Sequence, residues 1–243
     1  LNLTGGNGLS FSNADGSYFF SNATLTGGAG ISITNGSGGT FTFLENTSVT
    51  NAAVAAFSVA NSDARVTFSG TLSQASGTVL DVTAHTGAPL HFAAATLSAT
   101  GGNGLVFDNA DGPYTFNNVT LTGGAGIAIT NGSSGNFVFG SGTSVTNAAG
   151  AAIRVANSTA SLGYAGSISQ STPGSAAIDV SGHSVGTLFF NDATIAITGS
   201  NGLAFNDADG IYAFRNIVLS GGSSIAVTNG SAGAFTFGNV DLT

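Results

Sequence analysis

The chain has 243 residues, of which 42% are hydrophobic and only 6% are charged, and its net charge at pH 7 is −8. This apolar content is too high for a disordered chain, and three arginines without any lysine cannot form a surface that tracks phosphate groups. Without cysteine the chain has no disulfides and no thiolate metal sites, and no apolar stretch is long enough to cross a bilayer. We therefore expect an ordered protein that neither binds nucleic acid nor inserts into a membrane.

The first predicted element of each repeat is an apolar pair with one residue between its members. The pair recurs ten times at a mean spacing of 24 residues, and the i, i+2 spacing is typical of one face of a strand. The pairs are Leu9/Phe11, Ile31/Ile33, Phe57/Val59, Leu80/Val82, Leu105/Phe107, Ile127/Ile129, Ile153/Val155, Ile178/Val180, Leu203/Phe205 and Ile225/Val227.

Two further strand-like segments follow each pair. The second segment is rich in aromatic residues: Tyr18/Phe20, Phe41/Phe43, Val66/Phe68, Leu90/Phe92, Tyr114/Phe116, Phe137/Phe139, Leu162/Tyr164, Leu188/Phe190, Tyr212/Phe214 and Phe235/Phe237. The third is shorter and is centred on Leu25, Val49, Leu72, Leu97, Leu121, Val145, Ile168, Ile195, Leu219 and Leu242. Small polar residues alternate with both sets, as in half-buried strands.

Three short strands in about 24 residues predict an all-β fold, a right-handed parallel β-helix (β-solenoid) of about ten coils with three strands per coil. A repeat this short cannot close its own core, so each coil must stack on its neighbours. At a strand spacing of about 4.8 Å, ten coils give a rod roughly 48 Å long. A left-handed hexapeptide helix would need rungs of roughly 18 residues, which this chain lacks.

The sequence also contains a longer repeat that spans several coils. Near-identical stretches begin at Asn7, Asn103 and Asn201, which are 96 and 98 residues apart, or four coils. This predicts one solenoid over residues 1–243, built from four-coil units at approximately 5–100, 101–198 and 199–243, the last of them partial.

An asparagine follows the first strand in most coils, and the run is broken at Ala84 and Gly182 and varied by Asp207. A ligand site would not recur in nearly every coil, whereas stacked amides can hydrogen-bond along a column. We therefore predict a structural ladder of Asn13, Asn35, Asn61, Asn109, Asn131, Asn157 and Asn229.

Three aspartates in Asx-Ala-Asp-Gly turns are candidates for calcium ligands, namely Asp15, Asp111 and Asp209. They are four coils, or about 19 Å, apart and cannot share one ion. A capping role in the turns is the favoured interpretation, so no metal and no cofactor are expected.

Many β-helices act on polysaccharides, and paired carboxylates are the groups such chemistry needs. The candidates are Asp81, Asp179, Asp108 with Asp111, and Asp207 with Asp209, but no basic residue recurs beside them. No catalytic constellation can be assembled, and the protein is expected not to be an enzyme.

Hydroxyl pairs flank the buried residue of the third segment in seven coils, after which Ala196, Val218 and Asp241 interrupt them. The pairs are Thr24/Thr26, Ser48/Thr50, Thr71/Ser73, Thr96/Ser98, Thr120/Thr122, Ser144/Thr146 and Ser167/Ser169. A flat threonine array resembles the ice-binding face of β-solenoid antifreeze proteins, while threonine is also simply a good exposed strand residue.

Two sequence patterns carry a resemblance to a known class. Gly-Ala-Gly-Ile-x-Ile-Thr-Asn-Gly stands at 28–36 and 124–132, and Thr-Ser-Val-Thr-Asn at 47–51 and 143–147. The chain resembles the β-strand repeat region of large secreted bacterial adhesins and autotransporter-type passengers. The resemblance implies a non-enzymatic rod outside the cell or on its surface, either an adhesin stalk or a filament subunit. Its expected partners are further copies, end to end or laterally, and a surface glycan or host receptor is a further candidate. A polysaccharide-binding or -cleaving protein and an ice binder are the alternatives.

Overall fold

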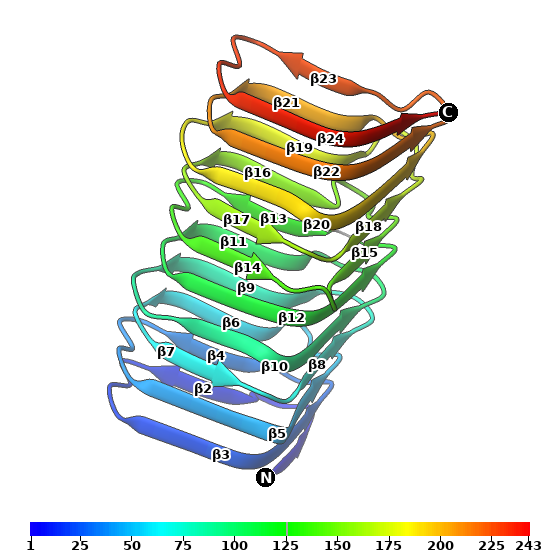
Figure 1. The fold of residues 1–243 in the computed structure, drawn as a ribbon. Helices are drawn as coiled ribbons and strands as arrows, with labels where there is room; N and C mark the ends of the chain where they lie inside the picture. Colours follow the sequence, from blue (N-terminus) through cyan, green and yellow to red (C-terminus); the bar gives the residue numbers. More distant parts are fainter. Residues whose placement is uncertain (125) are drawn as a thin grey trace.

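Parallel strands wind into a β-solenoid of about ten coils, which rises from the N-terminus to the C-terminus as an elongated stack (Figure 1). The computed structural model describes residues 1–124 and 126–243, so that Ala125 of the 124–132 segment lies outside the described residues. The described residues form no helix. The predicted all-β parallel solenoid with a repeat of about 24 residues is confirmed.

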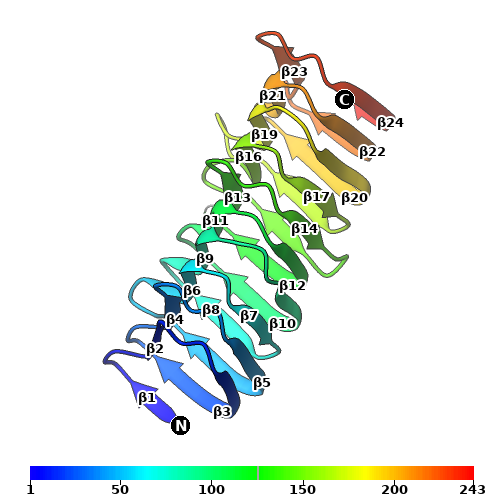
Figure 2. The same ribbon diagram turned by 90° about the vertical axis from the view of Figure 1, so that its left-hand side faces the viewer.

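The first strands of the ten coils form one parallel sheet (Figure 2). Each keeps its apolar pair in register with the pair above, as in Leu9 with Ile31 and Leu105 with Ile127. The strands of this first sheet are β2 (Leu9–Ser12), β4 (Ile31–Thr34), β6 (Ala55–Ser62), β9 (Thr78–His85), β11 (Gly104–Ala110), β13 (Ile127–Thr130), β16 (Ile153–Ser158), β19 (Ala176–His183), β21 (Gly202–Ala208) and β23 (Ile225–Thr228).

The second and third segments together form a 14-stranded sheet. In seven coils they join into one strand that bends at the corner: β3 (Ser17–Thr26), β5 (Thr40–Thr50), β10 (Leu90–Ala99), β12 (Pro113–Thr122), β20 (Thr187–Thr198), β22 (Ile211–Ser220) and β24 (Ala234–Leu242). Elsewhere they stay separate, as β1 (Asn2–Thr4), β7 (Arg65–Phe68), β8 (Thr71–Gln74), β14 (Asn136–Phe139), β15 (Ser144–Thr146), β17 (Ser161–Tyr164) and β18 (Ser167–Gln170).

The predicted three strands per coil therefore hold only where the corner breaks the sheet. The coils with a separate third strand carry glycine at that corner, for example Gly70 and Gly166. A Cβ atom at either position would overlap a backbone carbonyl of the coil below, that of Thr47 or Thr143. These two positions therefore accept only glycine, and the strand is interrupted at this corner.

Aliphatic and aromatic columns fill the interior, as the alternation predicts. Phe41, Phe57, Phe107 and Phe137 are completely buried. Rings on neighbouring coils stack nearly parallel, with centroids 4.7 Å apart for Tyr18 and Phe41 and 4.9 Å apart for Phe116 and Phe139. This spacing is that of the strands themselves, so the backbone register sets the aromatic packing.

At two places the register of the third segment differs from the one predicted by the series of central residues in the sequence. β10 pairs with β12 so that Leu97 lies over Val119, and not over Leu121. β20 pairs with β22 so that Ile195 lies over Ile217, and not over Leu219. In both cases the corner of the lower strand has two more residues than the corner of the strand above it. In β10, for example, four positions separate Phe92 from Thr96, whereas two separate their partners Phe116 and Asn118 in β12. Because the shift is even, inward-facing residues stay inside.

Candidate binding surface

One residue at the end of each first strand, either the second-to-last residue of the strand or the residue directly after it, adopts a left-handed backbone conformation in all ten coils. Its φ angle lies between 47° and 58°, and the ten residues are Asn13, Asn35, Asn61, Ala84, Asn109, Asn131, Asn157, Gly182, Asp207 and Asn229. Asparagine, aspartate and glycine tolerate this conformation better than other residues do. The backbone of the corner therefore accounts for the recurrent asparagine, and Ala84 is the one member without that tolerance.

Three asparagines of the predicted ladder bond through their amides to the coil below, and their acceptors are not other members of the ladder. The Nδ2 group of Asn35 donates to Ser12 Oγ over 3.0 Å, that of Asn131 to Asp108 Oδ2 over 2.8 Å, and that of Asn229 to Asn206 Oδ1 over 2.7 Å. Each acceptor immediately precedes a left-handed residue, and the three bonds recur four coils apart. They join the second coil of each unit to the first.

The three calcium candidates lie in turns where they accept backbone hydrogen bonds. Asp15 Oδ1 accepts from the Gly38 N–H over 3.0 Å, Asp111 Oδ1 from the Ser134 N–H over 3.0 Å, and Asp209 Oδ1 from the Ala232 N–H over 2.8 Å. Each carboxylate thus caps the turn of the next coil. Within the described residues, no three His, Asp or Glu side chains cluster as a metal site would require.

A column that is buried up to its last member, Ser231, runs inside this corner, and its residues repeat every four coils. We call it the corner column: Ala14, Ser37, Ser62, His85, Ala110, Ser133, Ser158, His183, Ala208 and Ser231. The serines bridge coils, since Ser62 Oγ donates to the Ser37 carbonyl over 2.6 Å and Ser37 Oγ accepts from the Ala14 N–H over 3.0 Å. The order Ala, Ser, Ser, His is repeated in the next four coils.

Each histidine of the corner column is held by a complete hydrogen-bond network. His85 Nε2 lies 3.1 Å from the Ala64 carbonyl oxygen, which can only accept, so Nε2 carries the proton. Nδ1 is then the acceptor for the Tyr114 hydroxyl at 2.9 Å, and that hydroxyl accepts from the Gly112 N–H. His183 makes the same bonds with Ala160, Tyr212 and Gly210. Sequence reasoning did not find these pairs.

Burial shifts the acid–base properties of these groups. Loss of solvation lowers the pKa of His85, although Asp63 and Asp111 act in the opposite direction, and lowers the pKa of His183 in the same way. Burial also raises the pKa of Tyr212 to about 12. The histidines are therefore neutral at pH 7, as the hydrogen bonds require.

The outward carboxylates of the first sheet do not converge. Asp179 forms an ion pair of 3.5 Å with Arg154, whereas Asp81 accepts a bond from its neighbour Thr83. They occupy equivalent places in coils four apart, so they are separated by about 19 Å along the axis. This arrangement lacks the two close carboxylates that glycoside hydrolysis uses.

Two outward columns of side chains, one on the first strands and one on the aromatic strands, have mixed chemistry. The first-sheet column is Ser10, Ser32, Ser58, Asp81, Val106, Ala128, Arg154, Asp179, Ala204 and Ala226. The aromatic-strand column is Phe19, Thr42, Thr67, His91, Thr115, Val138, Gly163, Phe189, Ala213 and Thr236. Charged, polar and apolar groups follow one another irregularly along the first-sheet column, and polar and apolar groups do so along the aromatic-strand column.

One outward column on the third segment is uniform. Owing to the two-residue shifts of register, one continuous row contains Thr4, Thr26, Thr50, Ser73, Ser98, Thr120, Ser144, Ser167, Thr194, Asn216 and Asn239. We call this row the hydroxyl column. All eleven side chains are uncharged hydrogen-bonding groups, and none is buried. The interruptions at Ala196, Val218 and Asp241 lie in the neighbouring column, because Ser169 pairs with Ala196.

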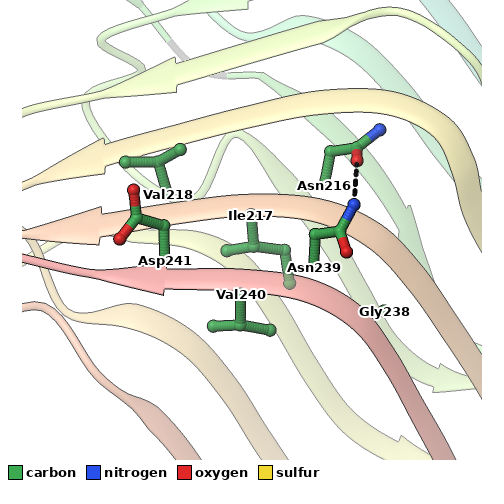
Figure 3. Close-up of a pocket in the computed structure, with 7 residues that line it drawn as sticks. All are labelled: Asn216, Ile217, Val218, Gly238, Asn239, Val240 and Asp241. Atoms are coloured by element: carbon green, nitrogen blue, oxygen red, sulfur yellow. Dashed lines mark hydrogen bonds between the residues drawn. The ribbon is translucent and has the colours of Figure 1, made fainter.

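The C-terminal end of the hydroxyl column forms the floor of a shallow hollow of about 550 Å³. Figure 3 shows Asn216 and Asn239 side by side on β22 and β24, with the Asn239 Nδ2 group donating to Asn216 Oδ1 over 3.3 Å. Val218 and Asp241 lie two residues along the same strands. The amides thus stack along the column, in the manner of an amide ladder.

Comparison with protein-family models, with curated proteins and with solved structures finds no match to this chain. In the part of the chain that the structure describes, no helix is long and apolar enough to span a membrane. The features of the surface therefore have to be interpreted from the chain's own geometry.

Proposed function

We propose that the protein is a non-enzymatic structural and adhesive rod that functions outside the cell or on its surface, as an adhesin stalk or a filament subunit. The observation that carries the proposal is the continuous interior, in which the corner column, the aromatic columns and the apolar pairs run from coil to coil. A solenoid of this kind gains length by repeating its interior, which is what a spacer needs.

The distribution of polar groups supports a structural role over a catalytic one. The inward-facing serines and histidines bond to backbone groups of adjacent coils, as Ser62 and His85 do. The carboxylates Asp15, Asp111 and Asp209 cap turns. These side chains are thus engaged in holding adjacent coils together.

Labelling of intact cells of the native host with an antibody to the folded chain, together with negative-stain imaging of the extracted protein, tests this proposal. We expect surface labelling that is removed by external protease, and rods whose length is a multiple of the coil spacing. Labelling only after cell lysis would contradict the proposed location. Turnover of any member of a broad glycan panel, lost in an Asp81→Asn or Asp179→Asn variant, would contradict the non-enzymatic role.

A further inference from the structure

The hydroxyl column differs from the first-sheet and aromatic-strand columns although all of them lie on the same coils. β5 carries Thr50 on the hydroxyl column and Thr42 on the aromatic-strand column, and both side chains are half-exposed. The strand preference of threonine acts on each of these columns alike, yet only the hydroxyl column is uniform, over eleven strands. Strand preference alone therefore does not account for it.

Uniform exposure of uncharged groups is also unusual for a surface that avoids association. Charges on exposed strands oppose the stacking of flat β surfaces. The chain has a net charge of −8, but none of its charged side chains stands in the hydroxyl column. A second copy would be repelled by much of the molecule and would meet no charge along this column.

From these observations we propose that the hydroxyl column is the surface through which two copies of the rod pair side by side. A partner can form hydrogen bonds to all eleven side chains of the row only if its own groups recur at the same spacing. A second copy has that repeat by construction, about 4.8 Å from coil to coil, and self-complementary pairing is the usual geometry of a homodimer.

The chemistry of the column favours a second copy over ice. Only five of its eleven members are threonines, the rest being serine and asparagine. A regular array of methyl groups is therefore absent from the described column, and what its members share is the ability to donate and accept hydrogen bonds. Short side chains with few rotamers also lose little conformational entropy when a facing row covers them.

The area of the surface indicates how strong the pairing can be. Ten strand spacings give a length of about 48 Å, and a face of about four residues is about 12 Å wide. Each copy would then bury about 600 Å², or about 1,200 Å² in total, which is the lower end of the range for specific interfaces. We expect weak, reversible pairing, strengthened by salt because screening reduces the repulsion between the acidic chains.

The inference rests on the proposed rod function, and it is tested on the purified chain, so that its failure can be told from a failure of the proposed location. Sedimentation velocity and light scattering from about 1 μM to 1 mM measure the mass of the wild-type chain. The column variant carries Thr50→Lys, Thr120→Lys and Thr194→Lys. The matched control carries the same charge on the aromatic-strand column, as Thr42→Lys, Thr67→Lys and Thr115→Lys.

We expect the wild-type chain and the control to dimerise, and the column variant to associate at least tenfold more weakly because like charges would face one another. A second variant with Thr50→Glu, Thr120→Glu and Thr194→Glu should also be monomeric, and a mixture of the lysine and glutamate column variants should regain the dimer. That recovery requires both variants to be folded, and it requires two columns to face each other.

Four results would overturn the proposal: a monomeric wild-type chain at 1 mM (an upper limit of about that concentration for a weak contact), equal loss of pairing in the control, no recovery in the mixture, or dimers that persist in both column variants. Co-sedimentation with insoluble neutral glucan, or partition into growing ice, by a wild-type chain that stays monomeric would assign the column to that partner instead.

Discussion

The corner column and the hydroxyl column run along the same rod but repeat with different periods. The corner column is buried and repeats as Ala, Ser, Ser, His over four coils, whereas the hydroxyl column is exposed and keeps one chemistry in every coil. Copying of a four-coil unit accounts for a four-coil period. The hydroxyl column keeps its chemistry in every coil, even where the register shifts. This one-coil period needs a cause that acts on each coil.

The comparison also separates two kinds of polar group. Those of the corner column are bonded within the chain, so removing one leaves a buried partner unpaired. Those of the hydroxyl column face water, so removing one leaves the rod intact. Four predictions test this division.

The largest effect is expected at a histidine of the corner column. His85→Ala removes a buried ring, and it leaves the Tyr114 hydroxyl without its acceptor and the Ala64 carbonyl without the Nε2 donor. We expect a loss of about 3–5 kcal/mol in the free energy of unfolding, measured by urea denaturation. His91→Ala on the exposed aromatic-strand column is the control and should change it by less than about 0.5 kcal/mol. Equal effects would remove the distinction between buried and exposed columns.

The second prediction concerns pH. Burial lowers the pKa of His85 and His183, so the unfolded chain binds protons more readily than the folded one. The resulting stability is present above the ordinary histidine pKa of about 6.5 and is lost as the pH falls through the lowered values, at up to about 2.7 kcal/mol per pH unit for two sites.

Urea denaturation at several pH values between about 7.5 and 5 measures this loss, in a range where carboxylates ordinarily stay ionised. A double variant with His85→Gln and His183→Gln cannot titrate there and should show a much flatter dependence on pH. If the variant has the same slope as the wild-type chain, other groups account for the acid sensitivity.

A smaller effect is expected at the strained corner residue. Ala84 has a φ angle of 49°, and its counterpart four coils on is Gly182 with a φ angle of 58°. Ala84→Gly should raise the free energy of unfolding by about 1 kcal/mol, because glycine adopts the left-handed conformation without steric conflict.

The reciprocal change, Gly182→Ala, should lower the free energy of unfolding by at least as much, since the new Cβ would approach Asn157 Oδ1 to 2.7 Å. Ala128→Gly within strand β13 is the control and should be destabilising, since its backbone gains nothing from glycine. Thermal unfolding followed by circular dichroism can rank all three variants.

The sequence predicted the coil spacing, the inward faces of the strands and the absence of helices, because period-two alternation and a 24-residue repeat are local signals. It did not predict the pairing of Leu97 with Val119, since the number of residues in a corner depends on packing between coils. The bond between His85 and Tyr114 spans 29 residues, and its only signal is that both residues recur together as His183 and Tyr212. The sequence did not predict the hydroxyl column either, because its members align only once the register at the corners is known.

The smallest effect, and the sharpest test of the comparison, is expected on the hydroxyl column itself. Ser98→Ala and Thr120→Val remove one hydroxyl each from exposed or half-exposed positions at which no buried partner depends on it. The free energy of unfolding should change by less than about 0.5 kcal/mol in either variant. A loss above about 1 kcal/mol would mean that these hydroxyls stabilise the rod, and the uniform column would then have a structural cause within each coil. No change in stability, combined with weaker pairing of the triple lysine variant, would leave association between copies as the cause.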